Sequence, residues 1–279
     1  MDASDVRQAS RAVWEAMARG WEERHTYFEV AARPVTETML DHGRPQPGQT
    51  VLDLAAGTGV VGLAAASHIG PDGRAIVSDF VPEMVEVARR NAQMLGMDNV
   101  DCRVLDAEDL ALDDDVVDVV LCRWGYMLMP DAEAALAESR RVLRSGGRLA
   151  CAVFAGPNEN PWAALPMQVL VERGHVSPPQ PGTPGTLALG DHGQLDALLT
   201  GAGFGAVDIE EVAFSWPFGD GDDYWRFLTE ASGAVAITIE GLAEDERQRV
   251  REDLLARLGP YETTEGIELP AVAVVAAAG

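Results

Sequence analysis

The sequence predicts an α/β protein with a doubly wound, mostly parallel sheet, an antiparallel C-terminal strand and added helical segments. Two observations lead to this prediction. From residue 50 onward, short runs rich in Val, Ile and Leu alternate with helix-like segments, as in parallel βαβ units. After residue 154 this alternation gives way to long stretches rich in Pro, Gly and aromatic residues, which exceed ordinary connections and indicate insertions.

Five apolar runs are the predicted parallel strands, and two later ones, at about 206–216 and 268–276, are predicted to pair as terminal strands. The five runs are 50–54, 75–78, 100–105, 116–121 and 148–154. Residues typical of helix ends support the predicted helices between these strands. Pro82 suits a first helical position, Gly96 lies just past a helix end, and Asp131 can cap the next helix.

The chain divides into three predicted parts. An N-terminal helical lid has helices over about 4–19 and 33–42, and a Rossmann-like core follows it. The C-terminal part completes the sheet and carries two cap insertions. The predicted boundaries are 1–48 for the lid, 49–154 for the core and 155–279 for the last part, with insertions at about 155–190 and 219–262.

Composition excludes several classes of function. A formal net charge of -24 over 279 residues would repel a phosphate backbone, so we expect no nucleic-acid partner. No apolar stretch approaches the roughly 20 residues of a membrane-spanning helix, and the start lacks the pattern of a secretory leader. Three cysteines without a CxxC pair suggest buried small side chains rather than a disulfide or metal site. We therefore expect a cytoplasmic protein without a bound metal.

The strongest motif is Val51-Leu52-Asp53-Leu54-Ala55-Ala56-Gly57-Thr58-Gly59, a strand that ends in a carboxylate and turns through small residues into a helix. Small residues let a ligand approach the backbone closely. The segment also satisfies GxGxxG, which permits a dinucleotide site. Asp53 favours a cationic ligand, because a carboxylate before the loop would oppose a pyrophosphate but suits an ammonium or sulfonium.

Two further predicted strands also end in acidic residues. Asp79 follows the second strand, where a carboxylate can accept hydrogen bonds from ribose hydroxyls. Asp106, next to Ala107, follows the third strand and could accept a bond from an adenine amino group, while Phe80 and Met84 could form apolar walls for the ring. These strand ends fit one adenosyl ligand.

The motifs VLDLAAGTGVVGL, SDFVPEMVEVARR, LDAEDL and RRVLRSGGRLA resemble, in order and spacing, those of class I S-adenosylmethionine-dependent methyltransferases, most nearly the ubiquinone and menaquinone biosynthesis branch. The resemblance implies S-adenosylmethionine as cofactor and S-adenosylhomocysteine as product. It places Asp53, Ala55 and Gly57 at the methionine end, Asp79 at the ribose, and Phe80, Met84, Asp106 and Ala107 at the adenine. Ala55 departs from the family's usual Gly, which is tolerable unless the position needs a positive φ.

Candidate residues for the methyl acceptor are largely aromatic. Arg123 could pair with the cofactor's carboxylate, and Trp21 on the leading segment could cover the cofactor. Each aromatic side chain has packing in the core as its alternative role. The residues predicted to form the acceptor pocket are Tyr27, Trp124, Tyr126, Met127 and Trp162. His25, Tyr126 and His175 are candidates for a general base, although an activated acceptor needs none, so no catalytic residue is assigned.

The predicted function is methyl transfer to a small, largely apolar acceptor, such as a quinone, a phenol or a natural-product intermediate. One alternative is a protein that keeps the cofactor but catalyses another reaction, such as a cyclisation. A second is a nicotinamide-dependent oxidoreductase, which GxGxxG permits but which leaves Asp53 and Asp106 unexplained. A homodimer is also predicted, because the aromatic N-terminal helix could pack against a second subunit.

Overall fold

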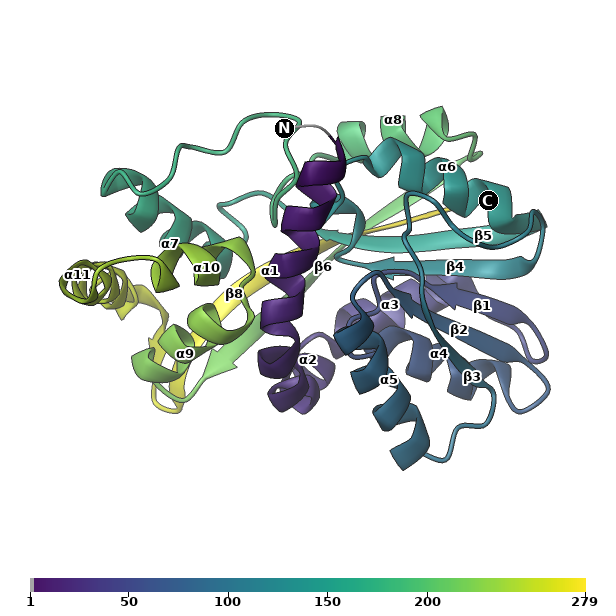
Figure 1. Cartoon of the computed structure of the whole chain (residues 1–279), viewed down its shortest axis with the longest axis horizontal. Coiled ribbons are helices and arrows are strands. Elements are labelled where there is room, and N and C mark those ends of the chain that lie inside the picture. Colours follow the sequence, from purple (N-terminus) through teal and green to yellow (C-terminus); the bar gives the residue numbers. More distant parts are fainter. Residues whose placement is uncertain (1–2) are drawn as a thin grey trace.

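The computed structural model describes residues 3–279, which build one mixed sheet with helices on it (Figure 1). The sheet order is β3-β2-β1-β4-β5-β8-β6, and β7 pairs with β8 beside this path. The strands are β1 (Thr50–Asp53), β2 (Arg74–Asp79), β3 (Val100–Val104), β4 (Val117–Arg123), β5 (Leu143–Phe154), β6 (Val207–Phe218), β7 (Glu262–Thr263) and β8 (Gly266–Ala278).

The strand directions confirm the predicted fold class. Strands β1 to β5 pair in parallel, whereas β8 lies between β5 and β6 and is antiparallel to both. The run 273–278 of β8 is fully buried, which explains why its sequence is continuously apolar instead of alternating. The outer strand β6 alternates more exposed and less exposed positions over much of its length, as an edge strand with one covered face does.

Helices connect the strands and form the added segments. Two single 3₁₀ turns, η1 (Tyr126–Leu128) and η2 (Gly259–Tyr261), complete the elements. The helices are α1 (Ala3–Glu23), α2 (His25–Ala31), α3 (Arg33–Gly43), α4 (Val60–Ile69), α5 (Pro82–Met94), α6 (Ala132–Val142), α7 (Pro161–Glu172), α8 (His192–Gly201), α9 (Gly221–Ala231), α10 (Ala234–Glu240) and α11 (Glu244–Leu255).

The predicted helix ends are present. Pro82 begins α5, and Gly96 follows its end with a φ of +66°. Asp131 caps α6 by accepting a hydrogen bond from the Ala134 amide. Residues 25–31, between the two predicted N-terminal helices, form the additional helix α2. The prediction that all three cysteines are buried was wrong, because Cys102 is only half-buried.

Helix α1 crosses the front of the molecule in Figure 1 and contacts both α5 of the central part and α9 of the second insertion. At the crossing with α9 the backbones nearly touch, because a Cβ built on Gly20 would lie 2.0 Å from the Glu230 carbonyl oxygen. Only glycine fits this approach. The N-terminal segment is thereby held against two parts of the chain that are far apart in sequence.

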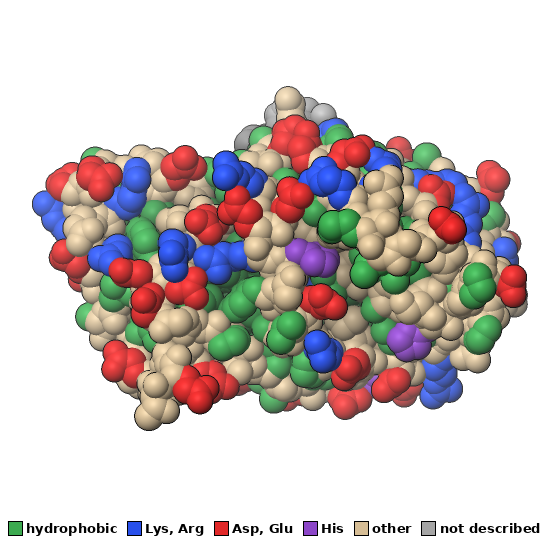
Figure 2. All heavy atoms as spheres, turned by 90° about the horizontal axis from the view of Figure 1, so that it is seen from below, with side chains coloured by type: hydrophobic (Ala, Val, Ile, Leu, Met, Phe, Trp, Pro, Cys, Tyr) green, Lys and Arg blue, Asp and Glu red, His purple; other side chains and the backbone are tan. Residues whose placement is uncertain are grey.

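No helix in residues 3–279 is both long and apolar enough to cross a membrane. On the face shown in Figure 2, arginine side chains are interspersed with acidic ones instead of gathering into a patch. Within the same residues, no group of three or more His, Cys, Asp or Glu side chains could hold a metal ion.

Candidate active site

The loop from β1 to α4 begins at Asp53, whose side chain is 1% exposed. Its Oδ2 accepts a hydrogen bond from the Gly62 amide at 2.7 Å, whereas its Oδ1 is buried without a partner. Burial raises the pKa of Asp53 to about 7, although the nearby Arg123 guanidinium opposes the rise. This carboxylate therefore has one free oxygen for a cation.

The glycine loop needs left-handed backbone at three positions, and one of them is not glycine. Gly57 and Gly59 have φ values of +55° and +89°, and Ala55 has a φ of +50°. The exception stated for Ala55 therefore applies: the position takes a positive φ, which a Cβ atom disfavours. Ala55 holds a strained backbone at the mouth of the loop.

Asp79, at the end of β2, turns its carboxylate toward the glycine loop. Its Oδ2 accepts from the Gly57 amide at 2.9 Å and its Oδ1 from the Val81 amide at 3.0 Å. Burial raises the pKa of Asp79 to about 6, while these amide bonds favour the charged form. Asp79 thus ties the ends of β1 and β2 together where an adenosyl ligand is predicted.

At the end of the third strand, most hydrogen bonds involve Glu108, which is a neighbour of the predicted residues Asp106 and Ala107. Asp106 accepts a bond from the Glu108 amide, and Ala107 beside it is buried. Glu108 itself accepts from the Arg7 guanidinium at 2.5 Å and from the Asp131 amide at 3.0 Å. Sequence reasoning did not assign this role to Glu108, because its partner Arg7 lies in the distant N-terminal helix.

Trp21 of α1 lies over the glycine loop. Its ring is 3.7 Å from the position that a Cβ on Gly57 would take, and its indole N–H donates to the Ala231 carbonyl at 3.0 Å. On the same side, Met84 is buried and Phe80 is partly buried. These two side chains share an apolar cluster with Trp21, and its remaining members are Trp14, Ala18 and Val81. The structure thus brings the predicted adenine walls under α1.

His25 of α2 contacts the next residue of the loop. Its Nδ1 lies 2.8 Å from the Thr58 hydroxyl and 3.3 Å from the Asn91 amide nitrogen of α5. Burial lowers the pKa of His25, and Arg123 adds to the effect. The ring is therefore neutral at physiological pH and fastens α2 to the glycine loop.

Arg123, at the end of β4, is a half-buried cation whose guanidinium donates to the Thr36 hydroxyl at 2.7 Å. It forms no salt bridge with any carboxylate in the described part of the chain. Its guanidinium lies 4.6 Å from the Trp124 ring centre. Burial lowers the pKa of Arg123 to about 10. A half-buried guanidinium without a carboxylate partner suits a carboxylate ligand.

Next to these polar groups lies a set of rings around Trp216, which we call the aromatic cluster. The rings at its centre pack closely: the Trp216 ring centre lies 5.7 Å from the ring centres of Tyr27 and Trp124 and 5.8 Å from that of Trp162. Its members are Tyr27, Phe28, Trp124, Phe154, Trp162, Phe214, Trp216, Phe218, Tyr224 and Phe227. Three predicted pocket residues, Tyr27, Trp124 and Trp162, therefore meet there.

Three predicted residues do not join this cluster. The Tyr126 hydroxyl shares a hydrogen bond with Ser139 of α6 at 2.7 Å, and burial raises the Tyr126 pKa far above its usual range. His175 bonds Glu246 of α11, at the end of the molecule opposite β3 (Figure 1). Met127 is buried and its carbonyl accepts from the Gly185 amide of the Pro/Gly-rich segment.

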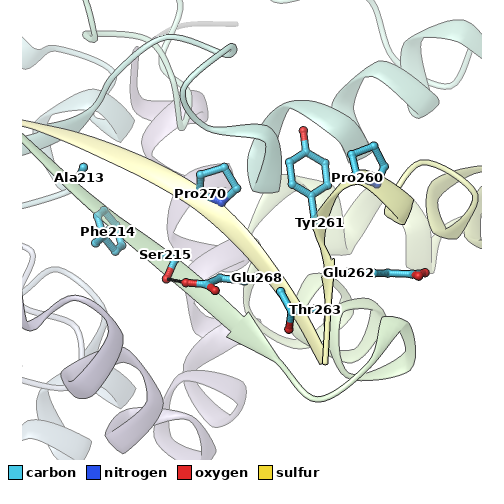
Figure 3. Close-up of a pocket in the computed structure, with 9 residues that line it drawn as sticks. All are labelled: Ala213, Phe214, Ser215, Pro260, Tyr261, Glu262, Thr263, Glu268 and Pro270. Carbon is cyan, nitrogen blue, oxygen red and sulfur yellow. Dashed lines mark hydrogen bonds between the residues drawn. The ribbon is translucent and has the colours of Figure 1, made fainter. Parts of the chain in front are cut away.

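The structure also has an open hollow of about 460 Å³ beside β6, β8 and η2 (Figure 3). Phe214, a member of the aromatic cluster, lines it, and the Ser215 hydroxyl there donates to Glu268 at 2.6 Å. None of the predicted site residues lines it.

Comparison with known proteins agrees with this geometry. Residues 45–170 match the family model of a methyltransferase domain. Nocamycin O-methyltransferase of Saccharothrix syringae is 32% identical over 232 residues, which cover 75% of this chain and 81% of that protein. The chain belongs to the S-adenosylmethionine-dependent methyltransferases. The cofactor of this family is S-adenosylmethionine, which excludes the nicotinamide-dependent alternative.

Other relatives of this methyltransferase differ in length and in reaction. Arsenite methyltransferase of Halobacterium salinarum is 33% identical over 207 residues, which cover 74% of this chain but only 48% of that protein. This chain thus spans about half the length of that relative.

Solved structures with the same fold include a geranyl diphosphate methyltransferase in complex with S-adenosylmethionine, with a TM-score of 0.52 and 16% identity over 88% of this chain and 84% of that one. The [4+2]-cyclase SpnF has a TM-score of 0.56 and 18% identity over 95% of both chains.

The residues of this methyltransferase fit its cofactor chemically. The free Oδ1 of Asp53 suits an ammonium group, and the unpaired guanidinium of Arg123 suits a carboxylate. Asp53 would bind a positive group and Arg123 a negative one, and an amino-acid moiety carries both. Asp53 at the end of β1 and Arg123 at the end of β4 thus fit the ammonium and carboxylate groups at the methionine end of the cofactor.

Proposed function

We propose that this enzyme methylates a small, largely apolar acceptor, a quinone, phenol or natural-product intermediate, bound in the aromatic cluster. The observation that supports this most directly is the contact between loop and cluster at Gly125. A Cβ built on Gly125 would lie 2.7 Å from the Ala55 Cβ, and Trp124, which precedes it, belongs to the cluster. Cofactor loop and aromatic rings are therefore immediate neighbours.

In this proposal the ends of β1, β2 and β3 hold the cofactor, which supplies a methyl group on a sulfonium. Asp53, Ala55, Gly57 and Arg123 take its methionine end, and Asp79 takes the ribose. Phe80, Met84, Asp106 and Ala107 surround the adenine. Trp21 would cover the loop from α1, so residues 1–48 serve as the lid and the insertions at about 155–190 and 219–262 as the cap.

The chain's main contribution is then orientation and exclusion of water. Holding a nucleophile in line with the methyl carbon can supply roughly 7–11 kcal/mol of the barrier. Tyr126 and His175 lie away from the cluster, and His25 is engaged with Thr58, so none of the three is positioned as a base. The proposal therefore assigns the role of base to none of these three side chains.

The decisive experiment measures binding and product separately. Calorimetric titration with S-adenosylmethionine and S-adenosylhomocysteine should show micromolar binding, with NAD as the negative control and Asp79→Asn as the weakened variant. Incubation with apolar acceptors and methyl-labelled cofactor should then yield labelled product. Cofactor binding without label transfer, together with an isomerised acceptor, would favour the cyclisation alternative. Failure to bind either adenosyl ligand would refute the proposal.

The homodimer and the cytoplasmic location stay predictions. Light scattering of the purified chain checks the first, and fractionation of the producing cells checks the second.

A further inference from the structure

The aromatic cluster contains buried hydrogen-bond donors that have nothing to bond. In the part of the chain whose side chains are described, five buried side-chain polar atoms lack a partner, and four belong to the candidate site. One is Asp53 Oδ1. The other three are the Tyr27 hydroxyl and the indole nitrogens of Trp124 and Trp216. Unpaired buried polar atoms are rare, so their concentration at one site indicates a ligand that pairs with them.

These three donors belong to adjoining rings. Trp216 is 1% exposed and Trp124 is 7% exposed, and the Trp216 ring lies 5.7 Å from both the Trp124 and Tyr27 rings. The donors come from the turn after β4, from β6 and from α2, so three separate segments contribute them. An indole N–H can only donate. Burial raises the pKa of Tyr27 beyond its usual range, which keeps that hydroxyl protonated as well.

The other polar side-chain atoms of the cluster are already bonded. The Trp162 indole N–H donates to Asn160 Oδ1 at 3.2 Å, and the Tyr224 hydroxyl donates to the Trp162 carbonyl at 2.6 Å. The charged side chains beside the cluster are paired with each other, since Arg24, 5.8 Å from the Phe227 ring centre, lies 3.4 Å from Asp223. The free groups of the cluster therefore offer protons for hydrogen bonding but cannot remove one from a nucleophile.

We propose that the acceptor is a flat conjugated molecule whose nucleophile is an already ionised oxygen, an enolate or a phenolate, received by the Trp124, Trp216 and Tyr27 donors. This inference rests on the proposed function. The lone pair of the oxyanion forms the new O–CH₃ bond, and the breaking S–CH₃ bond leaves its electron pair on sulfur. The sulfonium becomes a neutral thioether. No proton moves, so the step needs no base.

The test uses 2-hydroxy-1,4-naphthoquinone, which is ionised near neutral pH, and its neutral amine counterpart, 2-amino-1,4-naphthoquinone. Each is titrated calorimetrically into the enzyme saturated with S-adenosylhomocysteine. We expect the anion to bind about tenfold or more tightly than the amine, because hydrogen bonds to a charged oxygen are the stronger ones. Binding should weaken when acidification protonates the hydroxyquinone.

Matched variants identify the donors. Tyr27→Phe and Trp216→Phe each remove one unpaired donor and should weaken binding of the anion about tenfold. Trp162→Phe alters another ring of the same cluster, but the N–H group of Trp162 is already hydrogen-bonded. This variant should therefore change the affinity for the anion by less than about twofold. Binding of S-adenosylhomocysteine should stay unchanged in all three variants, which also shows that they fold.

Three results would overturn the inference: equal or tighter binding of the amine, an equal loss in Trp162→Phe, or binding of neither quinone. If the adenosyl ligand itself does not bind, the proposed function fails first. If it binds and the amine is methylated, only the oxyanion inference fails.

Discussion

The methyl group of Ala55 lies where a side chain at Gly125 would have to be. A Cβ on Gly125 would lie 2.7 Å from the Ala55 Cβ and 2.6 Å from the Cys122 sulfur, distances that real Cβ atoms do not show. Ala55 itself has a φ of +50°, in the left-handed region. The loop after β1 and the turn after β4 are therefore adapted to each other, with the alanine on one side and the glycine on the other.

Replacing Ala55 with Gly should stabilise the protein. The left-handed backbone at residue 55 costs a residue with a Cβ atom roughly 1–2 kcal/mol, and the greater unfolded-state entropy of glycine offsets part of the gain. We expect the free energy of unfolding to rise by about 0.5–1 kcal/mol, measured by urea denaturation followed by tryptophan fluorescence. Ala56→Gly is the control, because residue 56 has no positive φ and should lose stability. A loss in both variants would contradict the strain argument.

Gly125→Ala should have the opposite effect. Its new methyl group would meet Ala55 and Cys122, so the turn after β4 must shift. Overpacking of this kind costs typically 1–3 kcal/mol. The double variant Ala55→Gly with Gly125→Ala should recover part of the loss, because it removes one of the two clashing methyl groups. A double-mutant cycle by urea denaturation checks this, and strictly additive effects would show that the two residues do not interact.

Asp53→Asn should be more stable than the wild type at alkaline pH and bind the cofactor less well. Burial raises the folded-state pKa of Asp53 to about 7, above the roughly 3.9 of an unfolded chain. The folded protein therefore loses stability as the pH rises from about 4 through 7. We expect the variant to be more stable by about 2 kcal/mol at pH values near 8, and the difference to shrink by pH values near 5.

Urea denaturation at both pH values measures this difference, and calorimetry measures the loss of S-adenosylhomocysteine binding. A variant that is less stable at both pH values would show that the charged carboxylate stabilises the fold.

His25 should make stability depend on pH with the opposite sign. Burial lowers the pKa of His25, so at pH values below about 6.5 the unfolded chain binds more protons than the folded chain. The protein therefore loses stability as the pH is lowered through this range. Because Asp53 and Asp79 titrate in the same range, the informative quantity is the difference between wild type and His25→Gln. We expect the variant to lose less stability between pH values near 7 and 5.

Unfolding curves at several pH values check this prediction. The control is His68→Gln on α4, because His68 is exposed and bonds only the Ala64 carbonyl of its own helix. The same pH slope in wild type and His25→Gln would refute it.

Trp21→Phe should speed release of the product S-adenosylhomocysteine. The variant keeps a ring over Gly57 but removes the hydrogen bond to the Ala231 carbonyl that holds α1 to α9. A hydrogen bond of this kind contributes about 1 kcal/mol, so we expect release to be about fivefold faster in stopped-flow fluorescence. Arg19→Gln serves as control, because Arg19 pairs only with Glu23 of the same exposed helix face. Unchanged release would show that Trp21 does not hold the lid.

Local chemistry was sufficient to predict the central part of this enzyme. Asp53, Asp79 and Asp106 each follow an apolar run, and the carboxyl ends of neighbouring parallel strands meet at one edge of a sheet. Pro82, Gly96 and Asp131 marked helix ends because capping and left-handed positions depend on residues within a few places of each other. These features were therefore readable from the sequence before the structure was known.

Tertiary structure alone decided how the remaining parts fold back onto this edge. Trp216 was one of several aromatic residues in the insertions, and only the pairing of β6 with β8 brings it between Tyr27 and Trp124. The contact of Trp21 with Gly57 and the bond of Arg7 to Glu108 likewise join distant segments. Hydrophobic periodicity specifies which face of an element is buried but not which partner buries it, so the unpaired donors became visible only in the folded chain.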